Sequence, residues 1–125
     1  MKKIIKTDNA PRAIGPYSQG VIANGFIFTA GQIGLKPDTG EMVEGGVKEQ
    51  TRQVLENLKA ILEAGGSKLD NVVKTAVYLT KSEDFPFMNE VYAQYFTDEP
   101  PARTTIFVNS LPKGALVEIE AVAKI

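Results

Sequence analysis

The chain of 125 residues carries 14 basic and 15 acidic side chains and has no histidine, cysteine or tryptophan. This length suits a single domain over residues 1–125, and an apolar fraction of 43% is typical of a soluble globular protein. Without imidazole or thiol groups the chain cannot use Ser-His-Asp or Cys-His catalysis, a Cys/His zinc site or disulfides. The basic residues are scattered, so nucleic acid is not an expected partner.

The sequence shows no targeting or cofactor-binding motif. No apolar run is long enough to span a membrane, and residues 1–5 lack the apolar core and cleavage site of a secretory signal, so we expect a cytoplasmic protein. Gly31 and Gly34 form no phosphate loop, and residues 38–41 hold too few acidic side chains for a calcium loop. We therefore expect no nucleotide cofactor and no metal.

The beginning of the chain predicts antiparallel strands. Residues 2–6 are typical of a short strand. Residues 20–23 and 26–30 flank Asn24-Gly25, the strongest short signal for a type I′ hairpin.

Two helices are predicted further along. Between residues 47 and 64 apolar side chains recur at helical spacing, and Gly65-Gly66 supplies a stop. A second helix tolerates Pro86 in its first turn. Its apolar and aromatic side chains share one side, which we interpret as core rather than as a binding surface: Met88, Val91, Tyr92, Tyr95 and Phe96.

Strands at residues 72–80, 104–108 and 116–124 complete the order β-β-β-α-β-α-β-β. This order predicts an α+β fold in which two helices cover one face of a sheet. Phe26 and Phe28 point to one face and Ile27 to the other, so both faces are partly apolar. Such a patch is larger than monomers normally expose, which favours burial against other subunits and sites between protomers.

The segment around Arg103 predicts an anion site. Pro100-Pro101 favours an extended chain and places Arg103 at the start of a β-branched run. A guanidinium matches a carboxylate in bidentate fashion, and carboxylates follow in residues 111–120, so we expect the cation and the carboxylates near each other around a small anionic substrate. The alternative is that Arg103 forms a surface salt bridge.

The last strand places two carboxylates on one face. Alternation puts Glu118 and Glu120 on the side opposite Val117 and Ile119. If the apolar pair packs under the helices, the glutamates point at the second face, where a half-buried glutamate requires a partner. The alternative is that this side of the strand is simply solvated.

Across almost its whole length the chain resembles the YjgF/Rid family of reactive-intermediate (enamine/imine) deaminases. The resemblance rests on the joint order of several stretches: Asn9-Ala10-Pro11, residues 14–19, 30–33 and 50–57, Asn89-Glu90-Val91-Tyr92, Pro101-Ala102-Arg103 and residues 111–120. It implies one Rid/YjgF-like domain with a chorismate-mutase-like fold, a mixed sheet, a homotrimer with clefts at the subunit interfaces, and no cofactor.

The resemblance also implies roles for individual residues. Arg103 matches the arginine that binds the substrate carboxylate, and Glu118 matches the glutamate that positions the attacking water. Tyr17 matches a tyrosine at the cleft. The backbone of Gly31 lines the pocket, and Asn89 matches an asparagine near it.

Three positions depart from the family pattern. Ala30 stands where some members have serine, so position 30 can contact substrate only through its backbone. Thr105 stands where some members have cysteine, which excludes regulation by cysteine modification and leaves its backbone to receive the imine nitrogen. Gly34 replaces a frequent proline.

The implied activity is hydrolysis of 2-imino acids, which form from enamines such as 2-aminoacrylate, to 2-oxo acids and ammonia. This reaction needs orientation more than a powerful nucleophile, which fits the few reactive groups of the chain. A ligand-binding or regulatory protein that uses the same clefts without turnover is an open alternative. A ribonuclease or translation inhibitor is less favoured, because the chain is nearly neutral and has no histidine.

Overall fold

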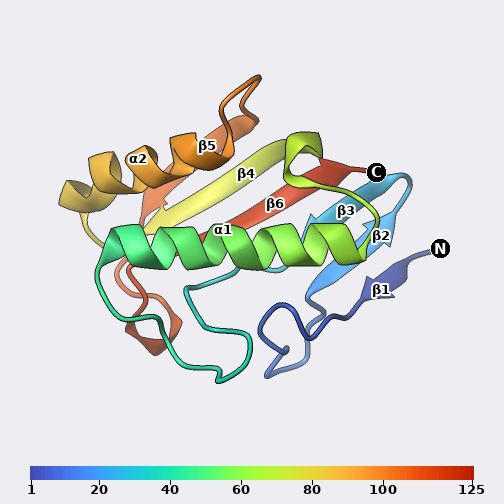
Figure 1. Ribbon diagram of the computed structural model, residues 1–125, viewed down its shortest axis with the longest axis horizontal. Helices are drawn as coiled ribbons and strands as arrows, with labels where there is room; N and C mark the ends of the chain where they lie inside the picture. Colours follow the sequence, from blue (N-terminus) through green and yellow to red (C-terminus); the bar gives the residue numbers. More distant parts are fainter.

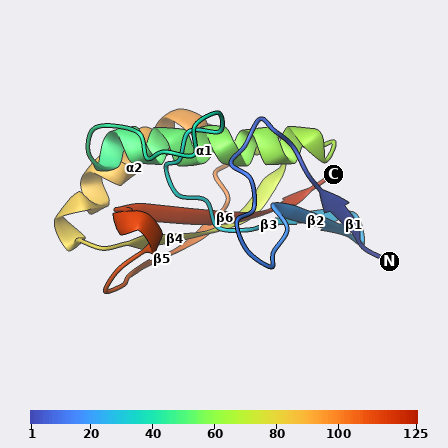
Figure 2. The ribbon, with the colours of Figure 1, turned by 90° about the horizontal axis from the view of Figure 1, so that it is seen from below.

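The computed structural model describes residues 1–125, which form a six-stranded sheet in the order β1-β2-β3-β6-β4-β5. Two helices lie on one face of this sheet, and the other face is open (Figures 1 and 2). The helices are α1 (Val47–Ala64) and α2 (Phe85–Tyr95). The strands are β1 (Lys3–Ile5), β2 (Gly20–Ala23), β3 (Phe26–Thr29), β4 (Val72–Leu79), β5 (Ala102–Phe107) and β6 (Val117–Lys124).

The predicted order of elements and the α+β class are confirmed. The sheet is mixed because α2 connects β4 to a parallel β5, whereas the other neighbouring pairs are antiparallel. β5 begins at Ala102, two residues before the predicted start, because Ala102 already pairs with Lys74. Neither helix is long and apolar enough to cross a membrane.

Local sequence explains where the first elements turn and stop. Asn24 and Gly25 have φ values of 55° and 83° between β2 and β3, as a type I′ turn requires. The backbone N–H of Gly46 donates to Oε1 of Glu49 at the start of α1. The helix ends at Gly65-Gly66, where Gly66 adopts a φ of 87° that disfavours side chains with a Cβ.

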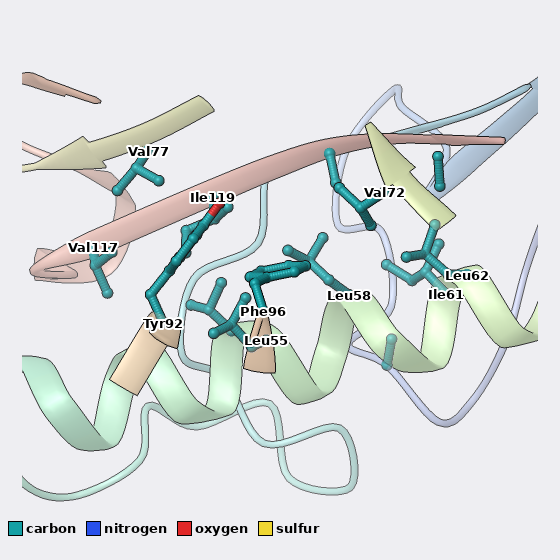
Figure 3. Packing of buried hydrophobic residues seen from close by; sticks show 14 of the residues in the cluster. Leu55, Leu58, Ile61, Leu62, Val72, Val77, Tyr92, Phe96, Val117 and Ile119 are labelled. Carbon is teal, nitrogen blue, oxygen red and sulfur yellow. The ribbon is translucent and has the colours of Figure 1, made fainter. Parts of the chain in front are cut away.

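The core lies between the helices and the sheet, with β6 at its centre (Figure 3). α1 contributes fully buried leucines such as Leu55 and Leu58, which face Val117 and Ile119 of β6. Tyr92 and Phe96, from α2 and its C-terminal end, pack into the same cluster. Each fully buried apolar side chain contributes about 1.5–3 kcal/mol. The aromatic residues predicted as core are buried, although Tyr95 is only half-buried.

The open face of the sheet is also apolar. The strand register places Ile4, Val21, Phe28 and Val122 in one row across four strands, on the side away from the helices. Ile4 is 54% exposed and Phe28 is 46% exposed. The two-faced apolar sheet expected from the sequence is therefore present, and its burial against other subunits stays a prediction.

Candidate functional site

Glu118 points to the open face of β6 and lines a cavity of about 320 Å³. Its neighbours along the strand, Val117 and Ile119, are fully buried on the helix side, and its strand partner is Tyr78. Glu118 is half-buried, accepts no hydrogen bond from the chain and forms no ion pair. It is therefore a carboxylate partly removed from water with its oxygens free for a ligand.

A bulge between β3 and β6 brings Ala30 and Gly31 to this carboxylate. Phe28 pairs with Val122, and pairing resumes at Gln32 and Ile119, so residues 29–31 lie opposite only residues 120 and 121. The Oγ1 of Thr29 accepts the N–H of Ala121 at 3.0 Å and satisfies the backbone within the bulge. The extra residue turns the chain away from the ladder beside Glu118, as bulges near ligand sites commonly do.

Only glycine fits at position 31, because the backbone there lies directly against the carboxyl group of Glu118. A Cβ at position 31 would lie 2.9 Å from Cδ of Glu118 and closer still to its Oε2. Real Cβ atoms essentially never come this close, so any side chain here would push the carboxyl group out of its position. Backbone groups of Ala30 and Gly31 thus form one wall of the cavity.

The pKa of Glu118 is raised, first because burial disfavours its charged form and second because the charge of Glu120 lies nearby on the same face. Glu120 is itself held by the Tyr78 hydroxyl, which donates to its Oε1 at 2.8 Å. A carboxyl group with a raised pKa is a better proton acceptor near neutral pH than an ordinary glutamate. The environment of Glu118 therefore suits general-base chemistry.

Tyr17 stands at the mouth of the same cavity with half of its surface exposed. Its hydroxyl accepts the backbone N–H of Ile14 at 3.3 Å, and its own N–H donates to the carbonyl of Gly15 at 2.8 Å. The tyrosine therefore closes a tight turn that forms one rim of the cavity.

Gln19 holds the segment that carries this rim, although it was predicted only as part of the family motif. It is 3% exposed, and its Nε2 donates to the carbonyls of Thr7, Ala10 and Pro11, while its Oε1 accepts the N–H of Thr7. Because every bond goes to backbone, the amide fixes the path of residues 7–11 whatever their side chains.

Amide side chains of α1 fix the opposite walls. The Nδ2 of Asn57 donates to the carbonyl of Leu35 at 3.0 Å, and the Oε1 of Gln50 accepts the N–H of Leu116 at 2.8 Å. Leu35 lines the cavity, and Leu116 lies two residues before Glu118 in the chain. Arg12 and Lys113 also line the cavity. Lys113 was expected only as part of the family motif at residues 111–120, and Arg12 was not predicted.

Arg103 lies elsewhere, on the helix side of the edge strand β5. Its strand partner is the buried Thr75, and its Nη1 donates to Oδ1 of Asn89 at 2.7 Å. The guanidinium also lies 4.8 Å from the ring centroid of Tyr92 and 5.6 Å from that of Phe85. Every one of these partners is uncharged, and the only ion pair of the chain joins Lys48 to Glu90. The alternative of a surface salt bridge at Arg103 is therefore wrong.

The expectation that the cation and the carboxylate lie near each other is also wrong for a single chain. Arg103 faces the helices and Glu118 faces away from them, and β4 separates their strands. The reason is the crossover through α2, which moves β5 to the edge of the sheet. The candidate residues form two groups: Tyr17, Ala30, Gly31 and Glu118 around the cavity, and Asn89, Arg103 and Thr105 below α2.

Thr105 belongs to the second group through strand alternation, two residues after Arg103. Its Oγ1 is buried and has no hydrogen-bond partner. A buried hydroxyl without a partner is uncommon, because it loses its hydrogen bonds to water. The chain has no group of three acidic, histidine or cysteine side chains that could hold a metal ion.

Comparisons with known proteins agree on one family. The family model described as Endoribonuclease L-PSP matches residues 7–125. A RutC family protein of Pyrococcus horikoshii is 58% identical over 123 residues, which span 98% of each chain. The human protein named 2-iminobutanoate/2-iminopropanoate deaminase is 49% identical over 123 residues, which span 98% of this chain and 90% of the human one. The crystal structure of Escherichia coli TdcF with bound serine has a TM-score of 0.93 and 44% identity, covering 98% of both chains.

Proposed function

The chain belongs to the YjgF/RutC/Rid family, and from this membership we propose that it hydrolyses 2-imino acids such as 2-iminobutanoate and 2-iminopropanoate. The products are the 2-oxo acid and ammonia. The relative at 49% identity that is named for this activity supports the proposal.

The observation that carries the proposal is that the chain holds two unpaired charged groups with complementary chemistry. Arg103 is fixed by neutral partners, so its full positive charge is available to a carboxylate. Glu118 has a raised pKa and no partner in the chain. A cation for binding and a base for water are the two groups that hydrolysis of an imino acid needs.

Because the two groups face opposite sides of one sheet, we propose that a complete site forms between copies of the chain. Arg103 of one copy and Glu118 of a neighbouring copy would then share one cleft. The apolar open face and the unpaired edge of β5 support an assembly of this kind, and we propose a homotrimer.

In the proposed mechanism, Arg103 holds the substrate carboxylate, with Asn89 fixing the guanidinium and the backbone near Thr105 close to the imine nitrogen. Glu118 accepts a proton from a water molecule as the water oxygen attacks C2 of the protonated imine, and the C=N electrons move to nitrogen to give a neutral carbinolamine. Glu118 then returns this proton to the amino group of the carbinolamine. The C–N bond breaks and ammonia leaves as C=O forms, and the hydroxyl proton passes to Glu118 and then to solvent, which leaves the 2-oxo acid. Tyr17 closes the cleft, and the backbone of Ala30 and Gly31 lines it.

The experiment is to generate 2-iminobutanoate in the presence of semicarbazide, which traps the imine, and to measure how far the protein suppresses trapping. Arg103→Ala removes a charge-assisted contact of about 1.5–3 kcal/mol per hydrogen bond, so the rate falls at least about tenfold. Arg52→Ala removes an exposed guanidinium from α1, whose Nη2 donates only to Gln94, and leaves the rate unchanged. A parent protein that does not suppress trapping contradicts the proposal.

A binding protein without turnover is the second candidate, and the bound serine of the TdcF structure favours testing it. Both candidates need Arg103, whereas only hydrolysis needs the base. Glu118→Gln therefore separates them: an enzyme keeps its affinity for 2-oxobutanoate and loses turnover. RNA cleavage, which the family description suggests, would instead show RNA binding that weakens steeply with salt, and the formal charge of −1 gives no support for it.

A further inference from the structure

Three side chains of α2 form a neutral cradle for the Arg103 guanidinium. Phe85, Asn89 and Tyr92 stand at positions i, i+4 and i+7 of the helix, so they form one stripe along its side. Asn89 accepts the hydrogen bond from Nη1, and the two rings lie 5.6 Å and 4.8 Å from Cζ. The cradle therefore contacts Arg103 by one amide and two aromatic rings, and by no carboxylate.

Tyr92 is the best anchored member of this cradle. It is 6% exposed, its ring packs 4.7 Å from that of Phe96, and its hydroxyl is 2.7 Å from Oγ1 of Thr75. Figure 3 shows the side chain reaching from α2 toward the sheet, with its oxygen at the far end. Thr75 is also the strand partner of Arg103. The ring that contacts the guanidinium is thus tied to the strand next to it.

We propose that Tyr92 is a positioning residue for substrate binding: its ring, fixed by Thr75 and Phe96, orients the Arg103 guanidinium for a carboxylate without neutralising its charge. This inference rests on the proposed function, because it assigns Arg103 to the substrate carboxylate. An arginine side chain loses rotational freedom about several bonds when it binds an anion. A partner that restricts the side chain beforehand lowers this entropy cost of binding. A carboxylate in the same place would restrict the arginine equally well but would occupy its donors.

The neutral state of Tyr92 is part of this role. Burial raises the pKa of its hydroxyl, although the hydrogen bond with Thr75 and the charge of Arg103 oppose the rise. The tyrosine therefore stays uncharged at neutral pH and does not become an anionic competitor for Arg103.

The effect should appear in affinity rather than in the chemical step. The Arg103–carboxylate contact exists in the substrate and in the transition state alike, so loosening it raises KM more than it lowers kcat. In Tyr92→Leu we expect KM for 2-iminobutanoate and Kd for 2-oxobutanoate to rise about tenfold, with kcat per folded chain within about threefold of the parent.

Tyr92→Phe is the conservative variant, because it keeps the ring and removes the hydroxyl. We expect its KM and Kd to rise by no more than about threefold, because packing on Phe96 still holds the ring when the bond to Thr75 is lost. Tyr95→Phe is the matched control: the hydroxyl of Tyr95 donates to Glu56 on α1, away from Arg103, and both constants should stay unchanged. The folded fraction of each variant is measured by circular dichroism.

Unchanged KM and Kd in Tyr92→Leu overturn the inference, and so does a loss in kcat alone. If Tyr92→Leu does not fold, Tyr92→Met takes its place, because an unbranched methionine fills irregular gaps in a core, and unchanged KM and Kd there overturn the inference equally. Calorimetric binding of 2-oxobutanoate needs no turnover. A parent that binds this ligand but hydrolyses no imine therefore refutes the proposed function while Kd still decides the role of Tyr92.

Discussion

Arg103 and Glu118 point to opposite faces of the same sheet, from strands that β4 separates. No movement of these two side chains alone brings them to one substrate. The proposed hydrolysis therefore depends on contact between copies of the chain. This dependence can be tested by combining two inactive variants.

Two inactive variants should restore activity when they are combined. Arg103→Ala supplies an intact Glu118, and Glu118→Gln supplies an intact Arg103, so a mixed trimer contains one complete site among its three. If mixed chains assemble at random in equal amounts, about one quarter of the sites are complete. The measurement is imine hydrolysis after co-expression of the two variants.

The control for this experiment is a double variant, Arg103→Ala with Glu118→Gln, co-expressed with either single variant. It lacks one of the two groups at every interface, so no activity should return. Mixed single variants that stay at the level of this control would show that the site does not combine these residues from two copies.

Gly31→Ala should remove activity with little loss of folding. A methyl group at position 31 overlaps the carboxyl group of Glu118, which must leave its place beside the cavity wall. We expect kcat/KM to fall at least about tenfold, as is usual when a reacting group is displaced. Kinetics and thermal unfolding of the same sample check both statements.

Gly46→Ser is the matched control for Gly31→Ala. A Cβ at position 46 meets no atom within 4 Å, and serine is favoured at the N-terminal end of a helix. Its activity should equal that of the parent. A Gly31→Ala variant as active as this control would mean that the position of Glu118 does not matter for the reaction.

The sequence predicted the elements well because each carries a local signal. The period of α1, its Gly65-Gly66 stop and the Asn24-Gly25 turn depend only on neighbouring residues, and the structure confirms all three. Local signals also placed Glu118 opposite the buried Val117.

Sequence reasoning failed where the answer depends on which strands become neighbours. Nothing near Arg103 reveals that β5 pairs in parallel with β4 at the edge of the sheet, so its separation from Glu118 was missed. The bulge at Ala30 is also a property of two strands, since it arises from a register change against β6. The stripe of Phe85, Asn89 and Tyr92 did have a signal, the i, i+4, i+7 spacing, but Tyr92 was interpreted only as core.

Gln19→Leu should destabilise the chain and loosen the rim of the cavity. Leucine has a similar size but leaves three carbonyls and the N–H of Thr7 without their partner, in a part-buried region. Leaving such groups unsatisfied costs about 1–3 kcal/mol each where water does not replace the bond. Urea unfolding should show a loss of at least about 1 kcal/mol.

The control for Gln19→Leu is Gln94→Leu, which removes an amide that only accepts a bond from the exposed Arg52. Its free energy of unfolding should change by less than about 0.5 kcal/mol. Equal stability of the two variants would mean that the Gln19 bonds are replaced by water and do not hold residues 7–11.

Glu120→Gln should move the acid limb of kcat/KM to lower pH. As a base Glu118 works only when ionised, and its raised pKa places the loss of activity above the ordinary glutamate value of 4.5. Burial is the larger cause of this rise and the charge of Glu120 the smaller, so removing that charge lowers the limb without bringing it to the ordinary value. Tyr78→Phe is the matched control, because it removes the hydrogen bond to Glu120 but keeps the charge, and its limb should not move to lower pH.

The raised pKa of Glu118 also affects the stability of the chain, which should fall as pH rises. Between the unfolded and the folded pKa of Glu118 the native chain binds more protons than the unfolded chain, so the free energy of unfolding falls as pH rises through this window. Glu118→Gln removes the titrating group. Its free energy of unfolding relative to that of the parent should therefore increase as pH rises from 4 to 8. The increase should be about the extra free energy needed to ionise one half-buried carboxyl in the folded chain rather than in the unfolded chain. Urea unfolding at several pH values measures the difference, and a variant whose stability relative to the parent falls as pH rises would contradict the assignment of the raised pKa to Glu118.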